Sequence, residues 1–186
     1  EQYLNDFGVK VLKNEKVTNV NHSNVETDKR TIKSRNIIWA AGNTASSLIG
    51  KLNTVTDDNG RAIVDPDCSL KDDPDVFVIG DASNHKDTSN TPLPGIAPVA
   101  MQQGKYVGKI IKNKILKMDR KPFKFSDKGM MATVGKYKAI GKIGNIEVSG
   151  FIAWVFWSVI HIVYLIGYRS KLLVIIEWIF SYLFNK

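Results

Sequence analysis

Residues 76–81, VFVIGD, decide the fold class. Four apolar residues follow Asp72-Asp73-Pro74-Asp75 and end at Gly80-Asp81. A short, β-branched run bounded in this way predicts a strand buried on both faces of a parallel sheet. Ligands of open α/β sheets bind outside the carboxyl ends of such strands, so Gly80 and Asp81 are candidate ligand-binding residues. The alternative is an aspartate that only caps its own turn.

A second apolar strand is predicted over 35–40, RNIIWA, and it ends at Ala41-Gly42. Small residues directly after a buried strand let a flat ligand or another backbone approach closely. A plain tight turn is the alternative at Ala41-Gly42. The preceding residues predict a helix end over 1–8 and strands over 9–20, 24–27 and 31–33.

Downstream, the apolar spacing predicts a helix over 96–117, with Pro98 in its first turn. If this helix starts near Gly80-Asp81, its free N–H groups and positive dipole end face a bound ligand. Gln102 and Gln103 are adjacent, so they cannot share a helix face. We expect one of them to point inward and the other into solvent.

The charge is segregated along the chain. The 26 Lys+Arg and 18 Asp+Glu give a net charge of +8, and residues 105–142 hold 12 basic and 2 acidic side chains. Such a block favours an anionic membrane surface. We expect no nucleic-acid partner, because no zinc-finger, helix-turn-helix or RNP-like pattern accompanies the block. A merely solvated charged face is the remaining alternative.

Two apolar segments, 151–167 and 172–184, predict an antiparallel helical hairpin. A membrane span takes about 20 apolar residues, so the 17 residues of the first segment are near the lower limit and the 13 of the second are too few. A single span and a hairpin buried in a soluble core are alternatives. The aromatic residues and the basic flank favour two helices lying in the membrane interface, on the cytoplasmic face of a bacterial inner membrane.

Cys68 is the only cysteine. A single thiol excludes an internal disulfide framework, a CxxC redox pair and a thiolate zinc site. We predict no metal site.

The order of three motifs and the hairpin resembles the type II NADH:quinone oxidoreductase family, the non-proton-pumping NADH dehydrogenases. The motifs are WAAG at 39–42, VFVIGDAS at 76–83 and PLPGIAPVAMQQG at 92–104. The resemblance covers essentially the whole chain as the C-terminal portion of such an enzyme. It implies an α/β fold, the C-terminal part of a flavoprotein with two Rossmann-like dinucleotide-binding domains, followed by a short β segment and a membrane-associated helical hairpin.

The resemblance also implies domains, cofactors and roles. Residues 1–46 would form the end of the NADH-binding domain, and residues 47–118 the C-terminal part of the FAD-binding domain. A basic β-rich connector over 119–150 would then lead to the membrane-anchoring hairpin over 151–186. FAD and the substrate NADH would meet near Ala41 and Gly42. The remaining implied contacts are Asp81 with the FAD ribityl chain beside Gly80, Ala97 and Pro98 with the flavin ring, and Gln102 or Gln103 with a membrane quinone. His161 is a candidate quinone-site or proton-path residue, with a merely interfacial role as the alternative.

This sequence departs from the family pattern in two ways. Pro98 stands where many relatives carry a glutamine, and no window shows the G-x-G-x-x-G spacing of a pyrophosphate loop. We therefore expect a fragment that is inactive by itself, with both loops upstream of Glu1. The alternative is a non-catalytic, membrane-associated flavin-domain module. The sequence assigns no catalytic residue. A homodimer is possible on the sequence alone. The lone Cys68 excludes a sulfide:quinone oxidoreductase or a disulfide reductase.

Overall fold

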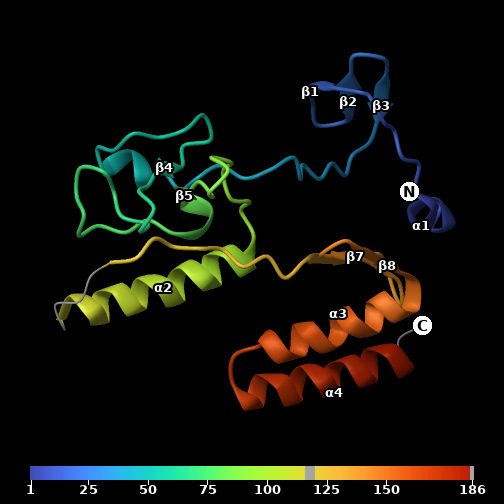
Figure 1. Cartoon of the computed structure of the whole chain (residues 1–186). Coiled ribbons are helices and arrows are strands. Elements are labelled where there is room, and N and C mark those ends of the chain that lie inside the picture. The colour runs from blue at the N-terminus through green and yellow to red at the C-terminus, as the bar shows by residue number, and fades with distance from the viewer. Residues whose placement is uncertain (116–119, 185–186) are drawn as a thin grey trace. The chain divides into compact units, whose positions relative to one another are not determined.

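The computed structural model describes residues 1–115 and 120–184 (Figure 1). The chain divides into two compact units. One is residues 38–126, and the other combines both ends of the chain, 1–37 and 127–186.

The unit 38–126 is built around two small apolar clusters and one long helix. Its elements are η1 (Ile49–Lys51), β4 (Ala62–Ile63), η2 (Gly80–Ala82), β5 (Ser83–Asn84) and α2 (Ala97–Ile115). The strands β4 and β5 pair in parallel. One buried cluster contains Ile49, Ala62, Leu70 and Val78, and the other contains Cys68, Val107 and Phe123. The predicted helix is confirmed over 97–115, and its last two predicted residues lie outside the described part.

The predicted parallel strand over 76–79 is wrong in this structure. Phe77 forms one isolated antiparallel bridge with Ser69, and the Val78 N–H donates to the Cys68 carbonyl at 3.0 Å. A strand needs a continuous neighbour for its ladder, and in the part of the chain described here the backbone of residues 76–79 forms hydrogen bonds to other backbone groups only within 68–73. Val78 is nevertheless buried, as the apolar pattern required.

The predicted strand over 35–40 is wrong as well. Its backbone is irregular, and Ile38 and Trp39 are 92% and 64% exposed. The segment is apolar, but no strand of the described residues pairs with it, so its side chains are not buried.

The unit of the chain ends holds two three-stranded antiparallel sheets. The first has the order β1-β2-β3, with β1 (Val17–Val20), β2 (Asn24–Thr27) and β3 (Thr31–Lys33). The second has the order β6-β7-β8, with β6 (Met130–Thr133), β7 (Ala139–Ile143) and β8 (Ile146–Ser149). The predicted strands over 24–27 and 31–33 are confirmed, whereas only the last four residues of 9–20 form a strand.

The first helix packs on the loop between β6 and β7. Helix α1 (Gln2–Asp6) ends before Gly8, whose φ of 73° fits the predicted cap. The Lys138 ammonium lies 3.0 Å from the Asp6 carboxylate. A Cβ on Gly135 would stand 2.5 Å from the Phe7 ring, so only glycine lets the loop approach α1 this closely.

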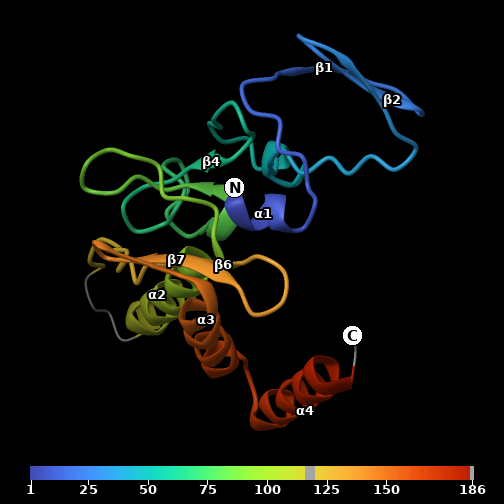
Figure 2. The same ribbon diagram turned by 90° about the vertical axis from the view of Figure 1, so that its right-hand side faces the viewer.

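The predicted helical hairpin is confirmed as α3 (Gly150–Tyr164) and α4 (Tyr168–Phe184). Ring centroids of Trp154 and Tyr182 lie 5.1 Å apart and those of Trp157 and Trp178 lie 5.6 Å apart, so the helices run antiparallel. Figure 2 shows the sheet with β6 and β7 beside the start of α3. Among the described helices, none combines the length and apolar character needed to cross a membrane.

Both hairpin helices leave large apolar side chains exposed. On α3 they are Phe151, Ile152, Val155, Phe156, Val159, Ile160 and Val163, and on α4 they are Leu172, Leu173, Ile176, Ile179, Phe180, Leu183 and Phe184. We call these residues the apolar hairpin face.

Candidate functional site

The tight turn η2 begins at Gly80, where the backbone leaves an extended residue, Ile79, for a left-handed conformation with φ of 66°. This φ favours glycine. A Cβ at Gly80 would also lie only 3.2 Å from the Ala100 Cβ of α2. The turn therefore rests directly on the first turns of α2, and any larger residue would push it away.

The Asp81 carboxylate lies beside the residues that lead into α2. A Cβ on Gly95 would stand 3.2 Å from Asp81 Oδ1. The side chains of Asp81, Ala97 and Pro98 are exposed, and no hydrogen bond found among the described residues uses the Asp81 carboxylate. The structure thus brings a free carboxylate to the positive end of a helix dipole, as the sequence predicted for Asp81 and the helix start.

The two adjacent glutamines have different partners. Gln103 is fully buried, and its Oε1 accepts the Gly80 N–H at 2.7 Å. Gln102 is half-buried; its Nε2 donates to the Ser126 carbonyl and its Oε1 accepts the Ser126 N–H, both at 3.0 Å. The expectation that one points inward is confirmed for Gln103. The expectation of a solvated partner is wrong, because Gln102 pairs with a backbone that follows 24 residues later.

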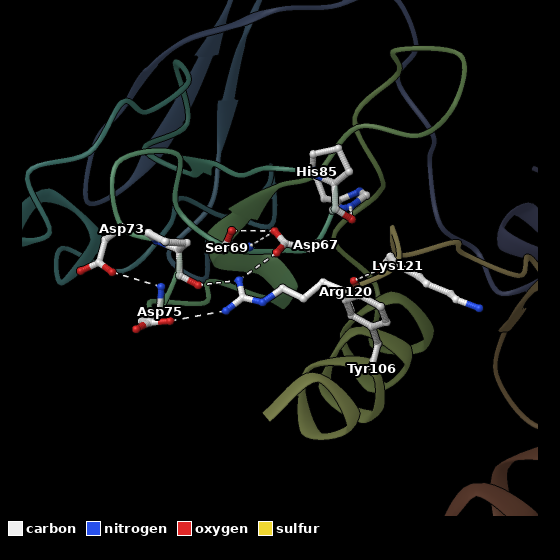
Figure 3. Close-up of polar contacts among 10 residues, drawn as sticks. Asp67, Ser69, Asp73, Asp75, His85, Tyr106, Arg120 and Lys121 are labelled. Carbon is white, nitrogen blue, oxygen red and sulfur yellow. Dashed lines mark hydrogen bonds and ion pairs between the residues drawn. The ribbon is translucent and has the colours of Figure 1, made fainter. Parts of the chain in front are cut away.

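The segment that follows α2, residues 120–126, is fastened back onto the unit. Arg120 donates to the Asp67 carboxylate at 3.1 Å and to the Pro74 carbonyl at 2.7 Å (Figure 3). The Tyr106 hydroxyl donates to the Lys121 carbonyl, which Figure 3 also shows. Sequence reasoning missed Arg120 and Asp67, because no local pattern signals an ion pair between residues 53 positions apart.

Electrostatics around this segment keep the acid charged and the thiol neutral. Although burial opposes it, hydrogen bonds from Ser69 and the Arg120 guanidinium hold the pKa of Asp67 below its ordinary value. Burial, with the Asp67 charge beside it, raises the pKa of Cys68 to about 12. Cys68 is therefore a protonated core residue and no nucleophile at neutral pH.

The other predicted site residues are Ala41, Gly42 and His161. Ala41 and Gly42 sit in an exposed, irregular stretch of the same unit, and Gly42 has a φ of 115°. His161 belongs to the other unit, where its ring stacks on Trp157 at 4.9 Å and on Trp178 at 5.7 Å. Within the unit 38–126, the structure therefore brings together Gly80, Asp81, Ala97, Pro98 and Gln103, and no hydrogen bond among the described residues joins them to Ala41 or Gly42.

Known proteins with similar sequences fall into one group. Residues 1–104 match the family described as pyridine nucleotide-disulphide oxidoreductase, and residues 128–186 match the NDH2 C-terminal domain. The chain is 36% identical to the type II NADH:quinone oxidoreductase Ndh of Mycobacterium tuberculosis, over 98% of this chain and 41% of that protein. It is 34% identical to NdhA of the same organism, with the same coverage. The chain thus spans less than half the length of these relatives.

Solved structures share the fold. NDH2 from Plasmodium falciparum, in complex with NADH, matches with a TM-score of 0.86 at 17% identity, over 99% of this chain and 54% of that chain. A FAD-dependent pyridine nucleotide-disulphide oxidoreductase from Desulfovibrio vulgaris matches with a TM-score of 0.57 at 24% identity, over 75% and 36% of the two chains. The resemblance drawn from the motifs is confirmed, and the chain belongs to the pyridine nucleotide-disulphide oxidoreductase family, with a C-terminal segment of the NDH2 type.

Proposed function

We propose that these residues form the C-terminal part of a flavin-dependent NADH:quinone oxidoreductase, which passes electrons from NADH through FAD to a membrane quinone. The observation that carries the proposal is the free Asp81 carboxylate at the start of α2, in a chain that also ends in an exposed apolar hairpin. The similarity to the type II NADH:quinone oxidoreductases Ndh and NdhA of Mycobacterium tuberculosis supports it. They do not favour the alternative of a non-catalytic module.

The residues around η2 fit a flavin. The exposed Asp81 carboxylate can accept hydrogen bonds from the hydroxyl groups of a sugar-alcohol chain. Gly80 and Gly95 let the backbone lie close to Ala100 and to the Asp81 carboxylate, which keeps Asp81 beside the start of α2. Ala97 and Pro98 place the positive end of α2 where it stabilises negative charge on a bound ring. A flavin bound there would supply the redox chemistry between NADH and the quinone, and these residues would hold and orient it.

The nicotinamide and quinone contacts belong to the same proposal. Ala41 and Gly42 would lie beside the flavin and nicotinamide, where an exposed backbone without large side chains suits a flat ring. Gln102, which is half-buried, and His161, which is exposed, would contact the quinone. Gln103 is enclosed by its own chain, so it would reach a ligand only through Gly80. The proposal includes four segments: the end of the NADH-binding domain over 1–46, the C-terminal part of the FAD-binding domain over 47–118, the basic connector over 119–150 and the anchoring hairpin over 151–186.

The hairpin would attach the enzyme to the cytoplasmic face of a bacterial inner membrane as a peripheral protein. Its apolar face offers the side chains that insert at the level of lipid headgroups, and its tryptophans suit the same depth. Lys105, Lys109 and Lys112 are exposed at helical spacing on α2, and basic residues near an anionic leaflet gain about 1 kcal/mol each.

The test compares the 186-residue chain with the longest natural chain that contains it. We expect the longer chain to carry the flavin absorbance bands and to oxidise NADH with menadione, and the 186-residue chain to do neither. A longer chain without flavin or without NADH:menadione turnover would overturn the proposal. Light scattering of the same preparation measures whether the protein is a homodimer.

A further inference from the structure

We propose that Gln103 is a positioning residue for the flavin site: its side chain fixes the Gly80 turn and thereby sets where the Asp81 carboxylate stands. Gln103 itself contacts no ligand in this role. The inference rests on the proposed function, because it concerns the same site.

Both backbone polar groups of Gly80 are hydrogen-bonded. Its N–H donates to Gln103 Oε1 at 2.7 Å. Its carbonyl accepts the Ser83 backbone N–H and, at 2.9 Å, the Ser83 hydroxyl. Ser83 is itself buried. The left-handed turn is thus locked by one side chain from α2 and one residue from β5, and the next residue along the chain is Asp81.

Core packing alone does not account for a glutamine at this position. Gln103 lies on the inner face of α2, where Val99, Val107 and Ile110 are buried and apolar. A buried amide is unfavourable unless it is hydrogen-bonded. Only the acceptor half of the Gln103 amide is used, since its Nε2 has no partner among the described residues. The contribution of this side chain is therefore its bond to Gly80.

Loss of the hydrogen bond between Gly80 and Gln103 would change the position of the Asp81 carboxylate. Without Oε1, the Gly80 N–H would be left unpaired, and the turn would relax toward a conformation that satisfies it. The Asp81 carboxylate would then move relative to the start of α2. Hydrogen bonds to a ligand weaken steeply when distance or angle departs from the optimum, so flavin affinity should fall although no ligand contact has been removed.

The experiment measures the flavin dissociation constant of the flavin-stripped natural chain by fluorescence titration. Gln103→Met keeps the size and removes the acceptor, and we expect about tenfold weaker FAD binding and a lower kcat, with an unchanged KM for NADH. Gln103→Glu keeps an oxygen in place, so it should retain more affinity. The FAD affinity of Gln103→Glu should be higher at pH 6 than at pH 8, because burial of an ionised carboxylate is unfavourable and protonation removes that charge.

Val107→Ala is the control for a general loss of packing. Val107 is one turn further along the same face of α2, and it packs with Cys68 and Phe123 rather than at the Gly80 turn. We expect it to lower the free energy of unfolding and to leave FAD affinity unchanged. If Gln103→Met does not fold, Ser83→Ala is the substitute variant. It removes the hydroxyl bond to the Gly80 carbonyl and keeps the backbone bond, so we expect a smaller loss of FAD affinity.

Three outcomes count against the inference. The first is that Gln103→Met binds FAD as tightly as the wild type. The second is that Val107→Ala loses as much affinity as Gln103→Met. The third, when Ser83→Ala is the variant used, is that its FAD affinity is unchanged. Each of these overturns the positioning role and leaves the proposed function standing. A wild-type natural chain that binds no FAD would instead overturn the proposed function, and this inference with it.

Discussion

The Arg120 guanidinium donates a hydrogen bond to the Asp67 carboxylate at 3.1 Å, across 53 residues of sequence. The same guanidinium lies over the Phe77 ring, 5.3 Å from its centroid. Phe77 belongs to the extended stretch that leads into Gly80. Arg120 therefore connects the segment after α2 to the backbone that carries the candidate flavin site.

Replacing Arg120 should destabilise the protein. We expect Arg120→Met to lower the free energy of unfolding by about 1–2 kcal/mol, because it leaves the half-buried Asp67 without its charged partner. Urea denaturation of the 186-residue chain measures this. Lys121→Met removes a positive charge from the neighbouring residue, whose backbone carbonyl accepts the Tyr106 hydroxyl. This backbone contact survives the substitution, so Lys121→Met should lower the free energy of unfolding far less. Equal losses in the two variants would contradict a specific role for Arg120.

The stability should also fall in acid. Hydrogen bonds and nearby cations hold the pKa values of Asp57 and Asp67 below the ordinary 3.8, against the opposing effect of burial. A carboxyl group whose folded pKa is depressed stabilises the folded state above its unfolded pKa, and that contribution disappears as the pH falls through the folded pKa. The urea midpoint should therefore decrease below about pH 4.

Arg120→Met should shift that acid transition. Removing the guanidinium raises the pKa of Asp67 in the folded state, so less stabilisation remains to be lost below pH 4. The variant's midpoint should start lower at pH 6 and converge toward the wild type near pH 2. A constant difference between the two proteins from pH 6 to pH 2 would show that Arg120 acts by packing rather than by charge.

The Cys68 thiol should be unreactive in the folded protein. It is buried with a pKa raised to about 12, so both access and thiolate fraction are low at pH 8. With the thiol reagent DTNB, we expect labelling at the rate of unfolding, and full labelling within seconds in concentrated urea. Immediate reaction of the native protein would mean that the core around Cys68 and Phe123 opens readily.

The apolar hairpin face should govern membrane binding. Phe156 is 52% exposed on α3, and Phe156→Glu replaces an inserting side chain by a charge, so partitioning into anionic vesicles should weaken about tenfold or more. His22→Glu adds a negative charge in the turn between β1 and β2 and serves as the control. Vesicle flotation of the 186-residue chain measures both. If the two variants lose binding equally, net charge and not the apolar hairpin face drives attachment.

Local patterns were sufficient for the helices and insufficient for strand pairing. The hairpin and α2 follow from periodic apolar residues and nearby caps, which are contained within each segment. The strands expected over 35–40 and 76–79 depend on neighbours elsewhere in the fold, and their apolar composition says nothing about whether a neighbour is beside them. The sequence likewise placed one glutamine inward, but it could not assign Gln103 to Gly80 or Gln102 to Ser126.

The packing of α1 on the loop between β6 and β7 has a consequence for biosynthesis. Asp6 and Lys138 are 132 positions apart. Asp6 leaves the ribosome before residues 38–126, and its partner Lys138 follows only after that whole segment has been made. Residues 38–126 can collapse around their own apolar clusters during translation, whereas the unit that combines 1–37 with 127–186 can close only afterwards. Such late, long-range closure is slow, and it leaves Phe7 and its neighbours available to chaperones or to aggregation in the meantime.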